Sequence, residues 1–197
     1  MIDLLLKNIH RTLFIIAPLL VAACSTSPIS MQLQPELALT QTSEPLISQS
    51  SWGINSQDHR IEQYLIEVSK GEKAATLINE SQSSRLIIET TLQQQWHKQG
   101  LRFNDESSNN INIELIKLLA KVEQKTLSHH IAAKIVIKVE LISKKQTFSK
   151  IFTLQSTKKG IFSANIDKVG EQLNIQLAQV LNEIIKDPQL NAKLQQL

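Results

Sequence analysis

The stretch from residue 131 to residue 141 constrains the fold more than any other part of the chain. Six apolar side chains fall on one parity of this stretch, namely Ile131, Ala133, Ile135, Ile137, Val139 and Leu141. The charged residues Lys134, Lys138 and Glu140 fall on the other parity. Because successive side chains of a strand point to opposite faces, this pattern predicts an antiparallel strand with one buried and one solvated face.

One further strand is expected upstream of it and one downstream. Upstream, apolar residues change from odd to even positions: Ile111, Ile113 and Leu115, then Ile116, Leu118, Ala120 and Val122. A change of parity within one strand indicates a β-bulge, here near Leu115–Lys117. Downstream, a polar turn at residues 143–146 leads into a strand whose inward side chains are Phe148, Phe152 and Leu154.

Two earlier strands and two helices are also predicted. The strands lie around residues 52–56 and 64–68, and residues 70–73 break the second one. A helix over residues 83–99 carries an apolar stripe of Ile88, Leu92 and Trp96. It begins at a capping serine, Ser83 or Ser84, and ends before the C-cap glycine Gly100. A longer amphipathic helix covers residues 166–184 and ends at Asp187-Pro188, and residues 189–196 are compatible with a short terminal helix.

This order of elements indicates an α+β fold. We expect a two-layer sandwich, with a mainly antiparallel sheet of about five strands and two amphipathic helices on one face. The opposite, lysine-bearing face is then open to water or to a partner. Farther upstream, Leu33, Leu37 and Leu39 are spaced so that they could dock as an edge strand.

The N-terminus has the layout of a secretory signal. Lys7 and Arg11 precede an apolar run at residues 13–23, which ends in small residues before Cys24, the only cysteine of the sequence. The run has 11 residues and contains Pro18, whereas a bilayer-spanning helix needs about 20 apolar residues. A signal is therefore favoured over an uncleaved transmembrane anchor.

Residues Leu19–Cys24 resemble the lipobox of a bacterial lipoprotein. The resemblance implies that residues 1–23 are removed, and that Cys24 then carries a thioether-linked diacylglycerol and an N-acyl chain. Each buried methylene contributes about 0.8 kcal/mol, so three acyl chains hold a protein firmly on a membrane. Ser25 follows the cysteine where aspartate would signal retention in the inner membrane. The same resemblance therefore implies the periplasmic face of the outer membrane.

The rest of the chain divides into a tether and one domain. Residues 24–46 are expected to be the lipidated N-terminus and a tether rich in Ser, Thr, Gln and Pro, whose root-mean-square span of roughly 25 Å would hold the domain clear of the headgroups. Residues 47–197 are expected to form a single α+β periplasmic domain.

Composition excludes several classes of function. The net charge is +3, or +2 once Asp3, Lys7 and Arg11 leave with the signal, and no basic stripe is present. This charge is too mild to indicate a nucleic-acid partner. A lone cysteine builds neither a disulfide framework nor a cysteine-based metal site, and the five glycines are not spaced for a phosphate loop.

The five histidines are the first candidates for chemistry. His129 and His130 are adjacent in a predicted strand, so they point to opposite faces and cannot jointly hold a metal ion. His97 lies on a helix flank beside Trp96. No hydrolase, zinc-protease or nucleotide-binding motif is present. We therefore expect no metal, no cofactor and no catalytic residue.

Asp58-His59-Arg60 is the one charged cluster at a strand end. As chemistry, the aspartate and the histidine could form an acid–base pair. As structure, Asp58 and Arg60 would tie down the loop between two strands as an exposed ion pair. The structural interpretation is favoured because no nucleophile accompanies the pair, but the alternative stays open. Lys158-Lys159-Gly160 is similarly interpreted as a solvated turn, with contact to an anion as the alternative.

The order of these features resembles the YajG family of bacterial lipoproteins. The features are the lipobox, the segment Leu33-Gln34-Pro35-Glu36-Leu37, the Asp58-x-Arg60 step, the helix closed by Gly100, the long hairpin and the C-terminal amphipathic helix. The resemblance extends from Cys24 to about Leu190. The family has no assigned activity, so the resemblance implies location and fold more than function.

Three functional hypotheses follow. The leading one is a non-enzymatic binding or accessory module of the cell envelope, anchored to the outer membrane through the lipid on Cys24. The alternative is an auxiliary subunit of an envelope transport or cell-wall assembly machine, held by a protein partner through the open sheet face or its edge. The third, a cell-wall hydrolase, has only Asp58 and His59 to support it.

Overall fold

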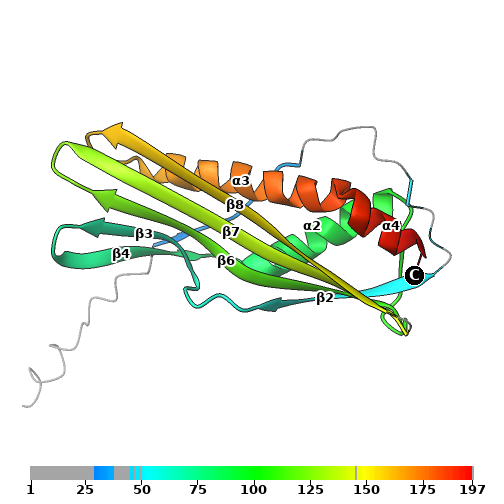
Figure 1. The fold of residues 1–197 in the computed structure, drawn as a ribbon. Helices are drawn as coiled ribbons and strands as arrows, with labels where there is room; N and C mark the ends of the chain where they lie inside the picture. Colours follow the sequence, from blue (N-terminus) through cyan, green and yellow to red (C-terminus); the bar gives the residue numbers. More distant parts are fainter. Residues whose placement is uncertain (1–28, 38–44, 47, 49, 145, 197) are drawn as a thin grey trace, which may run out of the picture.

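The computed structural model describes residues 29–37, 45–46, 48, 50–144 and 146–196. Cys24, Leu39 and the expected signal lie outside the described residues. In chain order the elements are β1 (Ser30–Met31), β2 (Ser51–Asp58), β3 (Tyr64–Lys70), β4 (Lys73–Glu80), α2 (Ser84–Lys98), β5 (Arg102–Phe103), β6 (Asn110–Gln124), β7 (Ser128–Ile142), β8 (Thr147–Ile161), α3 (Ile166–Lys186) and α4 (Pro188–Gln196). Together they form one sheet with helices on one of its faces (Figure 1).

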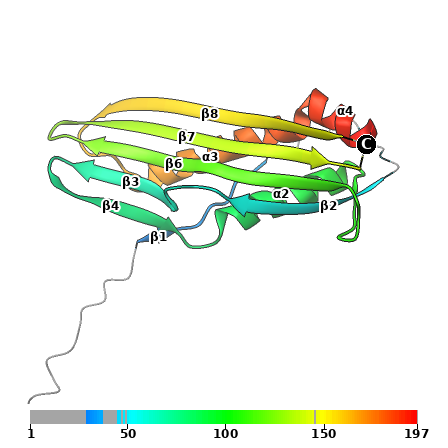
Figure 2. The same cartoon turned by 60° about the horizontal axis from the view of Figure 1, so that its bottom comes forward.

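The sheet is built around three strands of 15 residues each, β6, β7 and β8, which form an antiparallel meander. Along the other edge of β6, strand β2 pairs in parallel with residues 110–115 and strand β3 pairs in parallel with residues 120–124. Strand β4 pairs antiparallel with β3, while β1 and β5 pair in parallel with β4 and β2. The result is a mixed, eight-stranded sheet (Figure 2).

The expectation of a mainly antiparallel sheet of about five strands is wrong in two respects. The pairs β2–β6 and β3–β6 are parallel, because the chain reaches β6 through a crossover that contains α2. Strand β4 was not predicted, because residues 71–77 are all exposed and only Ile78 is buried, so no alternation marks it. The expected break at residues 70–73 is instead the tight turn that joins β3 to β4, with Gly71 at φ +57°.

The predicted parities of the long strands are confirmed. The inward side chains of β7 are buried from residue 133 to residue 141, and Phe152 of β8 is buried with Phe148 and Leu154 partly buried beside it. The register of β6 against β7 shifts between Leu115 and Lys117, which is the expected bulge. Because of this bulge, the apolar residues at 111, 113 and 115 share the core with those at 118, 120 and 122. Leu119 is buried outside this cluster, and Ile116 is only partly buried.

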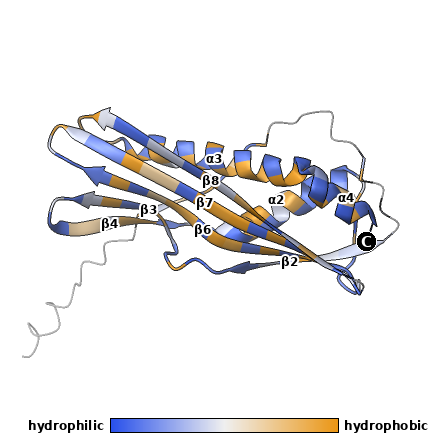
Figure 3. Cartoon of the chain, viewed as in Figure 1, coloured by the Kyte–Doolittle hydropathy of each residue, from blue (hydrophilic) through white to orange (hydrophobic). Residues whose placement is uncertain are grey.

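The helices pack against that apolar face. Helix α2 buries Ile88, Leu92 and Trp96, as predicted, and Gly100 closes it with φ +103°. Helix α3 begins at Asn165, whose side chain accepts a hydrogen bond from the backbone nitrogen of Lys168. Polar and apolar residues alternate along α3 and the long strands (Figure 3). The short terminal helix considered at residues 189–196 is present as α4, so three helices cover the sheet in the described part of the chain. No described helix is long and apolar enough to cross a membrane.

Residues upstream of position 47 contribute to the core. Leu33 and Leu46 are buried in the same cluster as the strands and helices. The residues that pair at the sheet edge are Ser30 and Met31, ahead of the leucines proposed for that role. The thioether of Met31 packs so closely on Gly170 of α3 that a Cβ at Gly170 would lie 2.7 Å from the Met31 methyl group.

Candidate functional site

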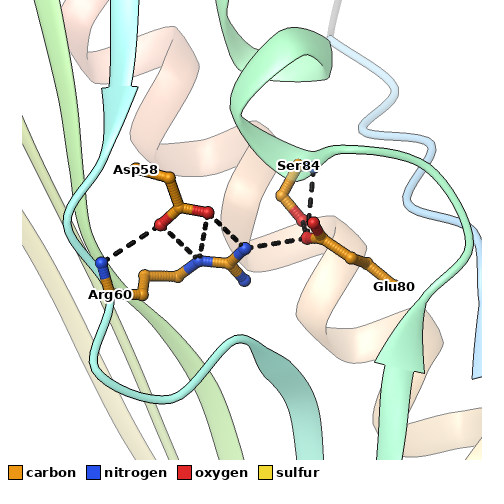
Figure 4. A network of polar contacts seen from close by, with 4 residues as sticks. All are labelled: Asp58, Arg60, Glu80 and Ser84. Carbon is orange, nitrogen blue, oxygen red and sulfur yellow. Dashed lines mark hydrogen bonds and ion pairs between the residues drawn. The ribbon is translucent and has the colours of Figure 1, made fainter.

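A network around Arg60 joins β2, β4 and α2 (Figure 4). Asp58, the last residue of β2, accepts hydrogen bonds from the Arg60 backbone nitrogen (3.1 Å), Nε (3.0 Å) and Nη2 (2.7 Å). The same Nη2 donates to Glu80, the last residue of β4, at 2.9 Å. Glu80 also accepts hydrogen bonds from the Ser84 hydroxyl and from the Ser84 backbone nitrogen (3.2 Å). A carboxylate that is bound to Arg60 therefore also caps α2.

The network keeps its charges fixed. Burial alone would raise the pKa of Asp58, but the hydrogen bonds from Arg60 and its positive charge lower it below the usual value. Burial alone would lower the pKa of Arg60, but Asp58 and Glu80 together raise it. These directions describe a permanent ion pair with no tendency to exchange protons near neutral pH.

The structural interpretation of Asp58-His59-Arg60 is therefore favoured, with one correction. The two partners do tie down the loop after β2, but Arg60 is not part of an exposed pair, because none of its side chain is accessible to solvent. His59 is turned elsewhere: its ring contacts Gln57 (3.0 Å) and lies 3.6 Å from the carboxylate of Glu114. The acid–base pairing of Asp58 with His59 is thus not formed, and nothing in this cluster indicates catalysis.

The remaining described histidines are dispersed. His97 Nδ1 lies 3.4 Å from the carbonyl oxygen of Leu101. His129 Nδ1 lies 3.0 Å from the carbonyl oxygen of Phe162, and the neighbouring His130 faces the other side of β7. Among the described residues, no three His, Cys, Asp or Glu side chains are grouped so that they could hold a metal ion.

A cavity of about 730 Å³ lies between the N-terminal half of α3 and the adjoining ends of β7 and β8. We call it the α3–β8 groove. Its walls are mainly apolar, and the apolar side chains include Ile131, Ala133, Ile161, Val169, Leu173 and Ile175. A volume in the range of about 300–1,000 Å³, with mostly apolar walls and a few polar groups, is typical of small-molecule sites.

The groove exists because the inward side chains of β8 change along the strand. Phe152 and Leu154 fill the space under the C-terminal half of α3, whereas Ser156, Lys158 and Gly160 on the same parity do not fill it. This change was visible in the sequence as a loss of apolar residues from the buried parity. The turn expected at Lys158-Lys159-Gly160 is not formed, because both lysines lie within β8.

A few polar groups converge inside the groove. Gln176 of α3 is 6% exposed, and its Nε2 donates to the Ser156 hydroxyl at 2.7 Å. The other amide atom, Oε1, is buried and has no hydrogen-bond partner among the described residues. Lys158 and Lys168 also line the groove, and neither has a carboxylate within ion-pair distance in the described part of the chain.

One end of the groove adjoins three exposed apolar side chains. Leu127 in the β6–β7 turn, Ile161 at the end of β8 and Phe162 after it are 71%, 74% and 65% exposed. The backbone nitrogen of Phe162 donates to the carbonyl oxygen of Leu127 at 2.9 Å, which holds the two segments together. We call these three residues the apolar tip, which lies where β8 ends and α3 begins, at the left of Figure 1.

Comparison with known families identifies the chain. A family model described as "Uncharacterized lipoprotein" matches residues 36–195. The chain belongs to this family. The resemblance to the YajG lipoproteins that the sequence motifs carry is thereby confirmed, and nearly all of the described residues fall within the matched region.

One solved structure shares the fold at low sequence identity, and a second matches with a lower TM-score. A Xanthomonas campestris protein of the DUF330 family matches with a TM-score of 0.59 and 13% identity, over 83% of this chain and 96% of that chain. A minor lipoprotein from Acinetobacter baumannii matches with a TM-score of 0.38 and 9% identity, over 75% of this chain and 95% of that chain. A comparison with curated protein sequences gives no match.

Proposed function

We propose that this lipoprotein is a non-enzymatic binding module, held on the periplasmic face of the outer membrane by acyl chains on Cys24. Membership of a lipoprotein family supports the anchor, as does the position of Cys24 directly after a signal-like run. The α3–β8 groove carries the binding role, because it combines apolar walls with unpaired polar groups and no reactive set.

The anchor and its membrane are tested by labelling cells with a radioactive fatty acid and separating their membranes by density. We expect the wild-type protein to be labelled and to sediment with the outer membrane. The Cys24→Ala variant should lose the label, and Ser25→Asp should keep it but move to the inner membrane. Label that persists in Cys24→Ala, or wild-type protein in the inner membrane, would contradict the proposal.

A second candidate, an auxiliary subunit of an envelope transport or cell-wall assembly machine, is favoured by the free edge of β8. Within the described residues, this strand of 15 residues pairs with β7 alone. An unpaired edge of that length can accept a strand from a partner.

This candidate is tested by placing a photo-crosslinking amino acid at Thr153, which is exposed on β8, and at Gln94, which is exposed on α2. Crosslinking in intact envelopes to one defined protein from Thr153 but not from Gln94 supports the subunit role. Equal crosslinking from both positions, or none from Thr153, contradicts it.

A further inference from the structure

We propose that the α3–β8 groove binds one acyl chain of an anionic membrane phospholipid, with the phosphate of its headgroup held by Lys158 and Lys168. The inference rests on the proposed function, because it takes the domain to lie beside a membrane. It adds the class of ligand and the residues that recognise it.

The walls of the groove suit a hydrocarbon chain. Ile131 and Ala133 form the side made by β7, while Val169, Leu173 and Ile175 form the side made by α3. A polar ligand would leave its hydrogen-bonding groups unpaired against these side chains, whereas an acyl chain loses nothing by leaving water. The walls therefore select for the apolar part of an amphiphile.

The cations of the groove differ from those on the opposite face of the sheet. On that face several lysines are paired with glutamates: Lys117 lies 2.5 Å from Glu62 and Lys138 lies 2.9 Å from Glu114. The exposed Lys134 of the same face has no ion-pair partner among the described residues. Lys158 and Lys168 line the groove without such a partner among the described residues. One acidic side chain, Glu171, also borders the groove.

The start of α3 adds to this positive charge. Lys168 belongs to the first turn of the 21-residue helix, and Asn165, the N-cap, also lines the groove. The N-terminus of a helix carries a partial positive charge that favours anions. Two unpaired lysines and a helix N-terminus at the entrance of an apolar cavity therefore complement a phosphate attached to an acyl chain.

The apolar tip provides the route into the groove. Ile161 belongs to both the tip and the groove wall, so apolar surface is continuous from the exposed tip to the cavity. Contiguous exposed apolar side chains beside basic residues are typical of a surface that contacts a lipid interface. A lipid could thus move from bilayer to groove without passing through water.

The N-terminal segment would keep the tip near the bilayer. Among the described residues, strand pairing begins at Ser30, six residues after Cys24, and six extended residues span at most about 22 Å. The next residue, Met31, packs on Gly170 of α3, next to Val169 of the groove wall. An anchor on Cys24 would therefore keep the start of α3 close to the headgroups.

The test is photo-crosslinking of the mature, full-length protein in lipid vesicles. The probe is phosphatidylglycerol with a diazirine in one acyl chain, carried in vesicles of phosphatidylethanolamine, and mass spectrometry locates the crosslinks. We expect crosslinks within residues 129–133 and 156–176. Crosslinks spread over α2 or over the outer face of the sheet would overturn the proposal.

Matched variants separate the groove from general membrane contact. Ile175→Glu places a charge on the groove wall, whereas Ile151→Glu places the same charge on β8 outside the groove, and the two isoleucines are 46% and 59% exposed. We expect Ile175→Glu to reduce the crosslinking yield by about tenfold and Ile151→Glu to change it by less than about twofold. Equal losses in the two folded variants would overturn the proposal.

The headgroup is tested by reversing charge. Lys158→Glu/Lys168→Glu should reduce crosslinking to the phosphatidylglycerol probe but not to a probe with a neutral, zwitterionic headgroup, whereas Lys134→Glu on the outer face should affect neither. If the double variant lost crosslinking to both probes, or kept crosslinking to both, the role assigned to the lysines would be overturned.

The acyl chains on Cys24 are the rival occupant, and Cys24→Ala detects them. Crosslinking that appears only after this substitution would show that the groove holds the protein's own lipid, and would overturn the proposal. This test and the anchor test can fail separately. If the groove is crosslinked in a protein whose Cys24 carries no lipid, the proposed anchor is refuted and the proposed groove ligand is not.

Discussion

Arg60 shows how one residue can hold three elements together. Its guanidinium is buried and binds the carboxylates at the ends of β2 and β4, one of which also caps α2. Without the guanidinium, the carboxylates of Asp58 and Glu80, which are only partly exposed, lose the cation that binds them. Breaking such a buried pair costs far more than breaking a surface pair.

We expect Arg60→Ala to lower the free energy of unfolding by about 3 kcal/mol, at the low end for a buried ion pair because water reaches Asp58 and Glu80. The matched control is Lys134→Ala, an exposed lysine on β7, which should change stability by no more than about 0.5 kcal/mol. Urea denaturation measures both. A loss of less than about 1 kcal/mol for Arg60→Ala would mean that the pair behaves as an exposed one.

The lowered pKa of Asp58 gives this network a pH dependence. Because the pKa is lower in the folded than in the unfolded state, the stabilisation is present above the unfolded value of about 4 and is lost as the pH falls through the folded value. Asp58→Asn should therefore be less stable than wild type at pH 5–7, and the difference should shrink below about pH 4. Urea titrations at each pH test this, and a constant difference would contradict it.

At the scale of elements, the β6–β8 meander and its two long helices account for most of the core. We expect Ile137→Ala to reduce the free energy of unfolding by about 2–5 kcal/mol, because Ile137 is fully buried in the middle of β7. Val136→Ala removes methyl groups from the next position, on the outer and less buried face. Chemical denaturation should find the smaller loss at Val136, and equal losses would mean that β7 does not bury the face assigned to it.

These elements were predictable because their signals are local. The alternation of β7, the parity change of β6 and the four-residue spacing in α2 are each set by contacts with one apolar face. The parallel pairing of β2 and β3 with β6 was not predictable, because it depends on partners far apart in the chain. The contact of Glu80 with Arg60 was not predictable for the same reason. Nor was the groove, because it depends on where α3 lies over β8.

At the scale of the whole molecule, the two faces of the sheet differ in their side chains. The outer face pairs Lys117, Lys121 and Lys138 with glutamates, while the helical face holds the core and, at one end, an unfilled apolar groove with two lysines that have no ion pair among the described residues. Figure 1 shows that end where β8 finishes and α3 starts. A domain with this asymmetry can bind a ligand at one end while an N-terminal anchor holds it beside a membrane.

The anchor is therefore the claim on which the account depends, and the mass of the N-terminal peptide of the protein purified from outer membranes tests it most directly. We expect the peptide to begin at Cys24 and to carry a diacylglyceryl group and one further acyl chain. A peptide that begins upstream of Cys24, or an unmodified Cys24 thiol, would contradict the account.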